Sequence, residues 1–373
     1  MIQLIDKSQC CGCGACSQVC PKNCIDLLED AEGFLYPKVK QDTCINCGLC
    51  EKVCPELNIA KQRKPLSTYA AKNPHESIRM KSSSGGVFSI IAEQVITRGG
   101  VVFGARFDDK WEVVHGYTET VEGLSAFRGS KYVQSRVGDS FKQAKDFLKE
   151  GRLVLFSGTP CQIMALKLFL RKEYANLLTI DIICHGVPSP KVWNLYLNGI
   201  GHRAMVKEFE FRNKSTGWKK YSLKCISEEK TIQEEYPKNT YMRTFLSNLP
   251  LRLSCYKCCA KQGRSNSDIT LGDFWGIEKV YPHFDDDKGC GSLLVYKKEI
   301  VDFLQESDLM EVKYDEILAG NPSLEHSVRQ PINRSYFFHL VSKGKSLQII
   351  YNRCFSDSYL MRVRRILYRK FGI

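Results

Sequence analysis

The sequence predicts an α+β protein in which a two-cluster ferredoxin-like domain precedes a mixed α/β domain. Eight cysteines near the N-terminus form a repeat with the spacing of bacterial ferredoxins. From residue 66 onward, strand-like and helix-like segments alternate, which is typical of a sheet covered by helices. The 373 residues suffice for two or three domains, and 43% apolar with 25% charged residues is an ordinary globular composition.

The first predicted domain, residues 1–60, contains the repeat. Each half follows C-x2-C-x2-C-x3-C and ends before a proline. Three closely spaced thiolates reach three irons of one cubane, and the fourth cysteine of each half serves the other cluster. We therefore expect two 4Fe–4S clusters, one bound by Cys10, Cys13, Cys16 and Cys54 and one by Cys44, Cys47, Cys50 and Cys20. Structural zinc sites use two C-x2-C halves instead. Cys11 and Cys24 are predicted to bind no iron.

The cysteine distribution also indicates the compartment. The 18 cysteines cluster in one N-terminal stretch and one later group, unlike those of a secreted disulfide scaffold. Met1–Ser8 includes Asp6 and has no apolar run, so we expect no secretory signal. No stretch approaches the ~20 apolar residues that span a bilayer. We expect a cytoplasmic chain with reduced thiols.

The formal net charge of +13 is unevenly distributed. Residues 1–60 hold five Lys and eight Asp or Glu, a local charge of −3, so the rest of the chain carries +16. Nucleic-acid binding is one explanation, but no zinc finger or RNA-recognition motif supports it, and we expect no nucleic-acid partner. An acidic cofactor, an anionic surface or an acidic redox partner fits the charge equally well.

The second predicted domain, residues 66–300, begins after a polar linker at 61–65. We expect strands at 69–72, 100–107, 111–117, 153–157 and 177–184, and helices at 87–96, 139–149, 161–170 and 189–200. Three of its loops have chemical potential. Ser82–Gly86 precedes a helix and can present backbone N–H groups to an anion, although such a sequence is more often only a cap. The second loop is Arg128–Tyr132, in which Lys131 can contact a phosphate or a flavin, or remain solvated.

The third loop, 157–161, places Cys161 at a strand-to-helix turn, as a nucleophile or a metal ligand. Cys184 follows the next strand, so it can lie near Cys161 at the same sheet edge. Together with a C-x2-C pair, they can form a third cluster site of Cys161, Cys184, Cys255 and Cys258. The alternative is that Cys161 and Cys184 are buried apolar residues. Cys259 is left out of the site, and three further cysteines are expected to be structural: Cys225, Cys290 and Cys354.

Six motifs in order carry a family resemblance: SSSGG (82–86), GSKYVQS (129–135), GTPCQ (158–162), CHGVPSP (184–190), CYKC (255–258) and DITLGDFWG (268–276). Over roughly 66–300 the chain resembles the beta subunit family of coenzyme F420 hydrogenases and dehydrogenases. The resemblance implies a non-covalent FAD beside a 4Fe–4S cluster at the third cysteine set. It also implies flavin contacts at Ser84, Gly85, Gly86, Ser130, Lys131 and Tyr132. The turn 272–276 is a further candidate for the wall of the cofactor site. In this turn, Trp275 either contacts the cofactor or belongs to the core.

The resemblance implies an iron–sulfur flavoprotein oxidoreductase that passes electrons between the clusters and FAD. Its substrate would be coenzyme F420 or another small anionic organic molecule, and a redox partner protein or ferredoxin would exchange electrons with it. The alternative is an electron-transfer subunit without its own substrate that feeds a catalytic partner, for instance in polysaccharide biosynthesis. No catalytic acid or base is evident. His185 is the histidine nearest to a proposed cluster ligand, and its alternative role is simply to hydrogen-bond its neighbours.

The last predicted segment, 301–373, is a C-terminal extension. Tyr359–Ile373 contains five basic residues and no acid, with apolar residues at helical spacing. A basic amphipathic helix of this kind lies on a membrane surface, docks on a partner or packs on its own domain. We favour packing or a partner.

Overall fold

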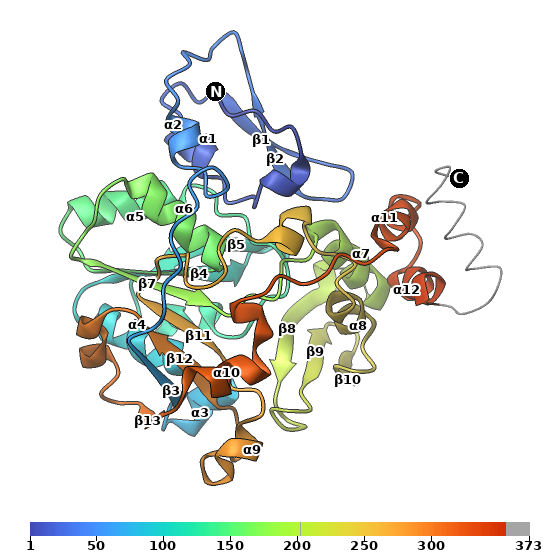
Figure 1. The fold of residues 1–373 in the computed structure, drawn as a ribbon. Coiled ribbons are helices and arrows are strands. Elements are labelled where there is room, and N and C mark those ends of the chain that lie inside the picture. The colour runs from blue at the N-terminus through green and yellow to red at the C-terminus, as the bar shows by residue number, and fades with distance from the viewer. Residues whose placement is uncertain (202, 356–373) are drawn as a thin grey trace.

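The computed structural model describes residues 1–201 and 203–355 of the chain. The ferredoxin-like segment lies at one end, above α5 and α6 of the central domain (Figure 1). It consists of η1 (Lys7–Gln9), α1 (Ala15–Val19), β1 (Ile25–Glu29), β2 (Leu35–Val39) and α2 (Leu49–Lys52), with β1 and β2 antiparallel. Gly14 and Gly48 precede α1 and α2 at φ 71° and 72°. The sequence repeat is thus a structural repeat, because each half starts its short helix from a left-handed residue that favours glycine.

An eight-stranded sheet forms the centre, in the order β13-β3-β12-β11-β7-β6-β4-β5. Its strands are β3 (Ser67–Lys72), β4 (Val101–Phe107), β5 (Val113–Thr118), β6 (Val154–Gly158), β7 (Leu177–Ile182), β11 (Ile269–Asp273), β12 (Gly291–Val295) and β13 (Asp308–Glu311). The neighbours β4, β6, β7 and β11 are parallel. The predicted mixed α/β character is confirmed. The sheet also takes in β13, which lies in the segment predicted as the C-terminal extension.

Helices cover both faces of this sheet because the side chains of each strand alternate between the faces. Val102 and Leu155 pack with α4 (Val87–Thr97). Phe103 and Phe156 pack on the other face with α5 (Ser140–Lys149) and α6 (Pro160–Leu170). The helices α3 (Glu76–Met80) and α7 (Pro190–Ile200) complete this part of the chain. Every strand and helix predicted between residues 66 and 200 is present, within a few residues of the expected bounds.

A second sheet was not predicted. It has the order β10-β9-β8 and consists of β8 (Val206–Asn213), β9 (Ser222–Ser227) and β10 (Thr231–Glu235). Its aromatic core includes Trp193 and Phe211 and is covered by α7, α8 (Thr240–Leu246), α11 (Arg334–Ser342) and α12 (Leu347–Phe355). Shorter elements connect the rest: η2 (Glu122–Phe127), η3 (Arg203–Met205), η4 (Leu253–Lys257), α9 (Ile277–Val280), η5 (Pro282–Phe284), η6 (Lys298–Phe303), α10 (Tyr314–Gly320) and η7 (Pro322–Leu324).

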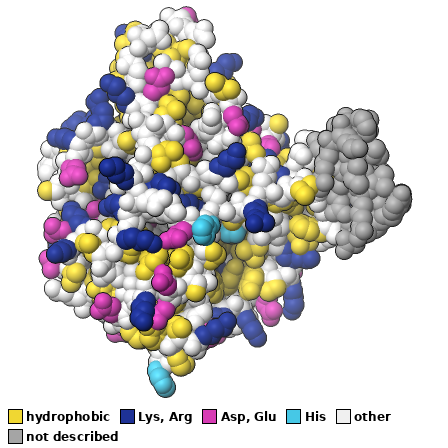
Figure 2. All heavy atoms as spheres, viewed as in Figure 1, with side chains coloured by type: hydrophobic (Ala, Val, Ile, Leu, Met, Phe, Trp, Pro, Cys, Tyr) yellow, Lys and Arg dark blue, Asp and Glu magenta, His cyan; other side chains and the backbone are white. Residues whose placement is uncertain are grey.

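The surface view adds information on charge. On the face shown in Figure 2, Lys and Arg side chains are scattered among acidic and apolar ones rather than gathered in one stripe. None of the helices in the described part of the chain has the length and apolar character to cross a bilayer. The predicted basic helix at 359–373 lies outside the described residues.

Candidate iron–sulfur and flavin sites

The cysteine set farther from the central domain, here called the distal set, comprises Cys20, Cys44, Cys47 and Cys50. All four line one cavity of the ferredoxin-like segment, although Cys20 comes from the other half of the repeat. Backbone N–H groups reach two of these sulfurs: Ile2 N lies 3.3 Å from Cys50 Sγ and Cys24 N lies 3.4 Å from Cys20 Sγ. The exposed Cys47 puts this site at the surface. Cys20 of the first half therefore lies where it can bind the same cluster as the three cysteines of the second half, as predicted.

The proximal set comprises Cys10, Cys13, Cys16 and Cys54. Burial, together with the nearby thiols of Cys10 and Cys54, raises the pKa of Cys16 to about 12. Cys10 also acts electrostatically on Cys13 and on Cys54. The structure thus brings Cys54 to the three cysteines of the first half. Thiols with raised pKa values stay protonated until a metal displaces the protons.

The spacing of these thiols differs from that of a single-ion site. Among residues 1–201 and 203–355, no three His, Cys, Asp or Glu side chains converge closely enough to hold one metal ion. A cubane lies between its four thiolates and separates them further than the ligands of one ion.

The third cysteine set lies at the carboxyl edge of the parallel strands. Cys161 is in the first turn of α6, directly after β6, and Cys184 lies two residues after β7. Because β6 and β7 are adjacent and parallel, their ends meet at one edge. The other two members come from η4 and the residue after it, Cys255 and Cys258. Electrostatic interactions connect Cys255 with all three other members.

The surroundings of the third set suit thiolate ligands. Burial raises the pKa of Cys184 to about 12 and that of Cys258 to about 11, whereas the Lys261 ammonium lowers both. Lys261 is buried, and its Nζ donates to the carbonyl oxygens of Cys184 and Ser323. A fixed positive charge beside four thiols favours their deprotonated, metal-binding forms.

Cys11 links the proximal and third sets. Its side chain is buried in a cluster with Cys13, against which Cys161 packs, and it interacts electrostatically with both thiols. Sequence reasoning treated Cys11 only as a residue outside the ligand register. Its position between two cysteine sets had no sequence signal, because the contact joins residues 150 positions apart.

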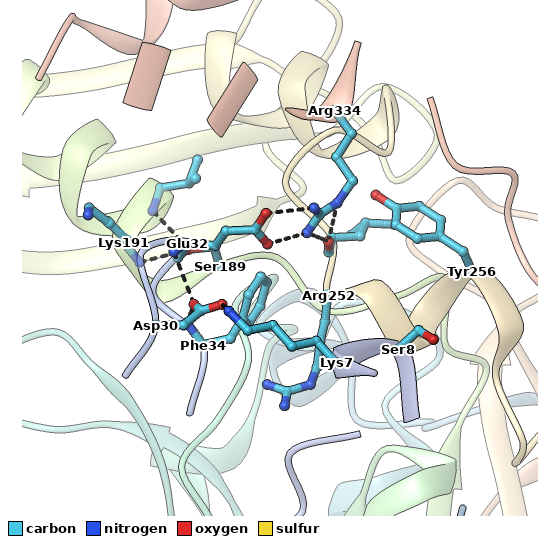
Figure 3. A network of polar contacts seen from close by, with 12 residues as sticks. Lys7, Ser8, Asp30, Glu32, Phe34, Ser189, Lys191, Arg252, Tyr256 and Arg334 are labelled. Atoms are coloured by element: carbon cyan, nitrogen blue, oxygen red, sulfur yellow. Dashed lines mark hydrogen bonds and ion pairs between the residues drawn. The ribbon is translucent and has the colours of Figure 1, made fainter. Parts of the chain in front are cut away.

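A buried polar network fixes the ferredoxin-like segment on the central domain (Figure 3). Arg334 of α11 forms a bidentate ion pair with Glu32, at 2.8 and 2.5 Å, and donates to Leu251 O. Arg252 donates from Nε to Cys10 O at 2.6 Å and from Nη2 to Cys10 Sγ at 3.4 Å. The proximal set is therefore held against the central domain by two arginines that no motif identified.

The two loops expected to contact flavin lie together. Ser130 N donates to Ser83 Oγ at 2.6 Å, which joins the SSSGG and GSKY loops. Ser84 Oγ donates to Cys290 O at 2.9 Å and to Gly272 O at 3.2 Å. Gly86 starts α4 in the left-handed conformation, whereas Gly85 packs so tightly that a Cβ would lie 2.1 Å from Ala71 O. Gly85 is thus required by backbone packing, while the start of α4 offers N–H groups to an anion.

Lys131 and Tyr132 point to different partners. Lys131 Nζ donates to Ala126 O and Arg128 O at 2.8 and 2.9 Å, and burial lowers its pKa to about 7. Its amine thus braces its own loop. The Tyr132 ring stacks on Phe245 at 4.9 Å, and its hydroxyl accepts a hydrogen bond from Arg212.

Sequence reasoning missed two buried bases beside these loops, Arg212 and Lys214. Arg212 forms a bidentate ion pair with Asp273 at 2.9 and 3.1 Å, and its Nε is buried with no hydrogen-bond partner among the described residues. Lys214 Nζ donates to three carbonyls, including Ser84 O at 2.6 Å. The indole rings of Trp218 and Trp275 stack 5.0 Å apart beside this pair. Neither base had a spacing signal: Arg212 lies in β8 and Lys214 directly after it, and isolated basic residues in such positions are usually solvated.

These residues fit a ligand that has both a phosphate and an aromatic ring system. The backbone N–H groups at the start of α4 suit phosphate, while the neighbouring aromatic rings suit a planar ring system. The loops also connect to the third cysteine set: the His185 ring contacts Phe245 at 5.2 Å, and Phe245 stacks on Tyr132. His185 Nε2 itself lies 2.6 Å from Asn248 Oδ1, in agreement with its expected simple hydrogen-bonding role.

Two family models match the chain: a 4Fe-4S dicluster domain over residues 3–60 and the C terminus of the coenzyme F420 hydrogenase/dehydrogenase beta subunit over residues 151–315. No curated protein matches the chain. A chain of the F420-reducing NiFe hydrogenase complex from Methanosarcina barkeri is similar at 13% identity and a TM-score of 0.48, over 77% of this chain and 91% of that one. Residues 3–60 therefore match the dicluster ferredoxin domain, and residues 151–315 match the C-terminal part of the coenzyme F420 hydrogenase/dehydrogenase beta subunit, in agreement with the family resemblance of the motifs.

Proposed function

We propose that the chain is an iron–sulfur flavoprotein oxidoreductase with two ferredoxin clusters, a third cluster and FAD. Electrons pass between the clusters and FAD, which reduces or oxidises coenzyme F420 or another small anionic substrate. When bound, the clusters supply one-electron transfer and FAD couples it to two-electron chemistry. The observation that carries the proposal is the packing of Cys161 against the buried cluster that contains Cys11 and Cys13, which brings the third cysteine set next to the proximal set.

The proposed ligands follow from the three cysteine sets. The distal set binds one cluster, the proximal set the second, and Cys161, Cys184, Cys255 and Cys258 the third. The distal set lies at the surface, so a redox partner protein or ferredoxin exchanges electrons there. Supporting this order, His185, Phe245 and Tyr132 form a continuous contact from the third set to the proposed flavin loops.

The proposed flavin contacts are Ser84, Gly86, Ser130 and Tyr132 of the predicted set, with Lys131 bracing its loop and Gly85 allowing close packing. Arg212, whose buried Nε has no hydrogen-bond partner among the described residues, is added to them. The family description names a beta subunit of a hydrogenase or dehydrogenase, so a partner subunit is part of the proposal.

Anaerobic purification with iron and flavin analysis tests this function. Three clusters correspond to about twelve irons per chain, and FAD should be released on denaturation. Cys184→Ser should lower the content to about eight irons, whereas Cys290→Ser, a buried cysteine outside the three sets, should leave it unchanged. A folded wild-type chain with about eight irons would remove the third cluster, and one without flavin would remove the oxidoreductase.

The reaction itself is tested with reduced protein and coenzyme F420. Turnover by the isolated chain supports an enzyme with its own substrate. Turnover that requires a second subunit assigns the chemistry to the complex.

A further inference from the structure

We propose that Arg252 raises the reduction potential of the cluster bound by the proximal set, through a charged hydrogen bond to Cys10. The inference rests on the proposed function, since it requires that cluster. It concerns a residue outside all six family motifs and outside the cysteine sets.

Arg252 is fully buried, at 0% exposure, although it carries a permanent positive charge. Its side-chain hydrogen bonds all reach the ferredoxin-like segment or Gln134, whose side chain donates to Cys11 O of that segment. In addition to Cys10 O and Cys10 Sγ, it donates to Leu35 O at 2.9 Å and to Gln134 Oε1 at 3.0 Å. The guanidinium also lies over the Tyr36 ring at 4.2 Å. The partners around it fix its orientation toward the sulfur.

The effect on the cluster follows from charge. Reduction adds one negative charge to a cluster and its thiolates, and hydrogen bonds to sulfur together with nearby charge set the potential. Burial alone disfavours that extra charge, because the low-dielectric surroundings solvate it poorly. A guanidinium in the same surroundings stabilises it strongly. Arg252 therefore keeps a buried cluster reducible.

The loop around Cys10 is shaped to admit this side chain. Gly12 has φ +73°, and a Cβ there would lie 2.7 Å from Arg252 Nη1 and 2.6 Å from Gln134 Nε2. Gly14, in the same loop, has φ +71°, but the nearest atom to its Cβ would be Leu27 Cδ1 at 3.5 Å. Only Gly12 is needed for the arginine to approach.

The distal set has a different environment. Its sulfurs receive backbone N–H groups, from Ile2 and Cys24, and Cys47 is exposed to solvent. The reduction potential of a cluster bound there should not depend on Arg252. Arg334 provides the matched control, because it also docks the ferredoxin-like segment, through Glu32, but its hydrogen bonds reach no sulfur (Figure 3).

The test is a redox titration of the full chain under anaerobic conditions, followed by electron paramagnetic resonance. Arg252→Gln should make one ferredoxin cluster about tenfold harder to reduce, which is about 59 mV for one electron, and leave the other unchanged. Arg252→Lys should recover part of the shift. Arg334→Gln should shift neither cluster.

A second pair of variants covers the case in which Arg252→Gln loses its cluster. Gly12→Ala should move the same midpoint in the same direction, whereas Gly14→Ala, with the same backbone strain, should not. An unchanged midpoint in fully loaded Arg252→Gln or Gly12→Ala, or an equal shift of both clusters, overturns the role of Arg252. A wild-type chain without two ferredoxin signals overturns the proposed function instead.

Discussion

Replacing Asp273 by Asn should destabilise the central domain strongly, because it leaves a buried arginine without its counter-charge. The Arg212 side chain is 2% exposed and that of Asp273 is 17% exposed. The carboxylate accepts two hydrogen bonds from Arg212 and a third from Trp218 Nε1 at 2.9 Å. Asn keeps the shape but presents an NH2 group to one of these donors and removes the negative charge.

The expected cost follows from this burial. Removing one partner of a buried ion pair costs about 3–5 kcal/mol, and the residual exposure of Asp273 favours the lower end, about 3 kcal/mol. The double variant with Arg212→Met should cost much less than the sum of the single changes, because no uncompensated charge remains. The control is Glu228→Gln. Glu228 faces Lys207 at 3.8 Å with 61% and 62% of the side chains exposed, so its loss should cost about 0–1 kcal/mol.

Urea unfolding followed by tryptophan fluorescence measures these costs. The stacked Trp218 and Trp275 rings adjoin the ion pair, so the signal reports on the same region. A cost below about 1 kcal/mol for Asp273→Asn would refute the argument from burial. So would additivity of the two single changes, since it would mean that the charges do not interact.

Two further predictions concern acid stability and iron content. Burial lowers the pKa of His115 to about 4, and its Nδ1 has no hydrogen-bond partner among the described residues. The neutral ring therefore contributes stability above pH 6.5 that is lost as the pH falls toward 4, about 3 kcal/mol in all. His115→Gln should flatten the unfolding free energy over this range, and an unchanged slope would contradict the prediction. Cys24→Ser should keep the full iron content, whereas Cys20→Ser should lose about one cluster; equal iron loss would show that Cys24 is also a ligand.

The sequence predicted the parts of the site that depend on neighbouring strands. Cys161 and Cys184 follow consecutive parallel strands, so their meeting at one sheet edge could be inferred from the order of elements alone. The repeat likewise predicted that Cys20 and Cys54 leave their own halves. Both inferences use short-range spacing and a regular fold, which a single sequence contains.

The sequence could not predict the contacts that depend on docking. Arg252, Arg334 and Arg212 look like ordinary surface bases in the chain, and only the tertiary structure shows that they are buried. The second sheet was missed for a related reason. The adjacent polar residues Lys207 and Glu208 in β8, and the polar run 233–235 in β10, interrupt the alternation of apolar and polar residues expected of a half-buried strand.

The docking contacts also decide what kind of carrier the ferredoxin domain can be. Its linker is not loose: Arg63 Nη2 donates to Ser267 O at 2.6 Å, and Arg63 N to Gln262 O at 3.1 Å. Together with the Arg334 and Arg252 contacts, this ties the domain to the central domain on both sides of its cysteine sets. A domain held in this way cannot swing between partners without leaving buried charges unpaired, at a cost of several kcal/mol. We therefore expect the external redox partner to come to the distal set, while the distance between the proximal and third sets stays fixed.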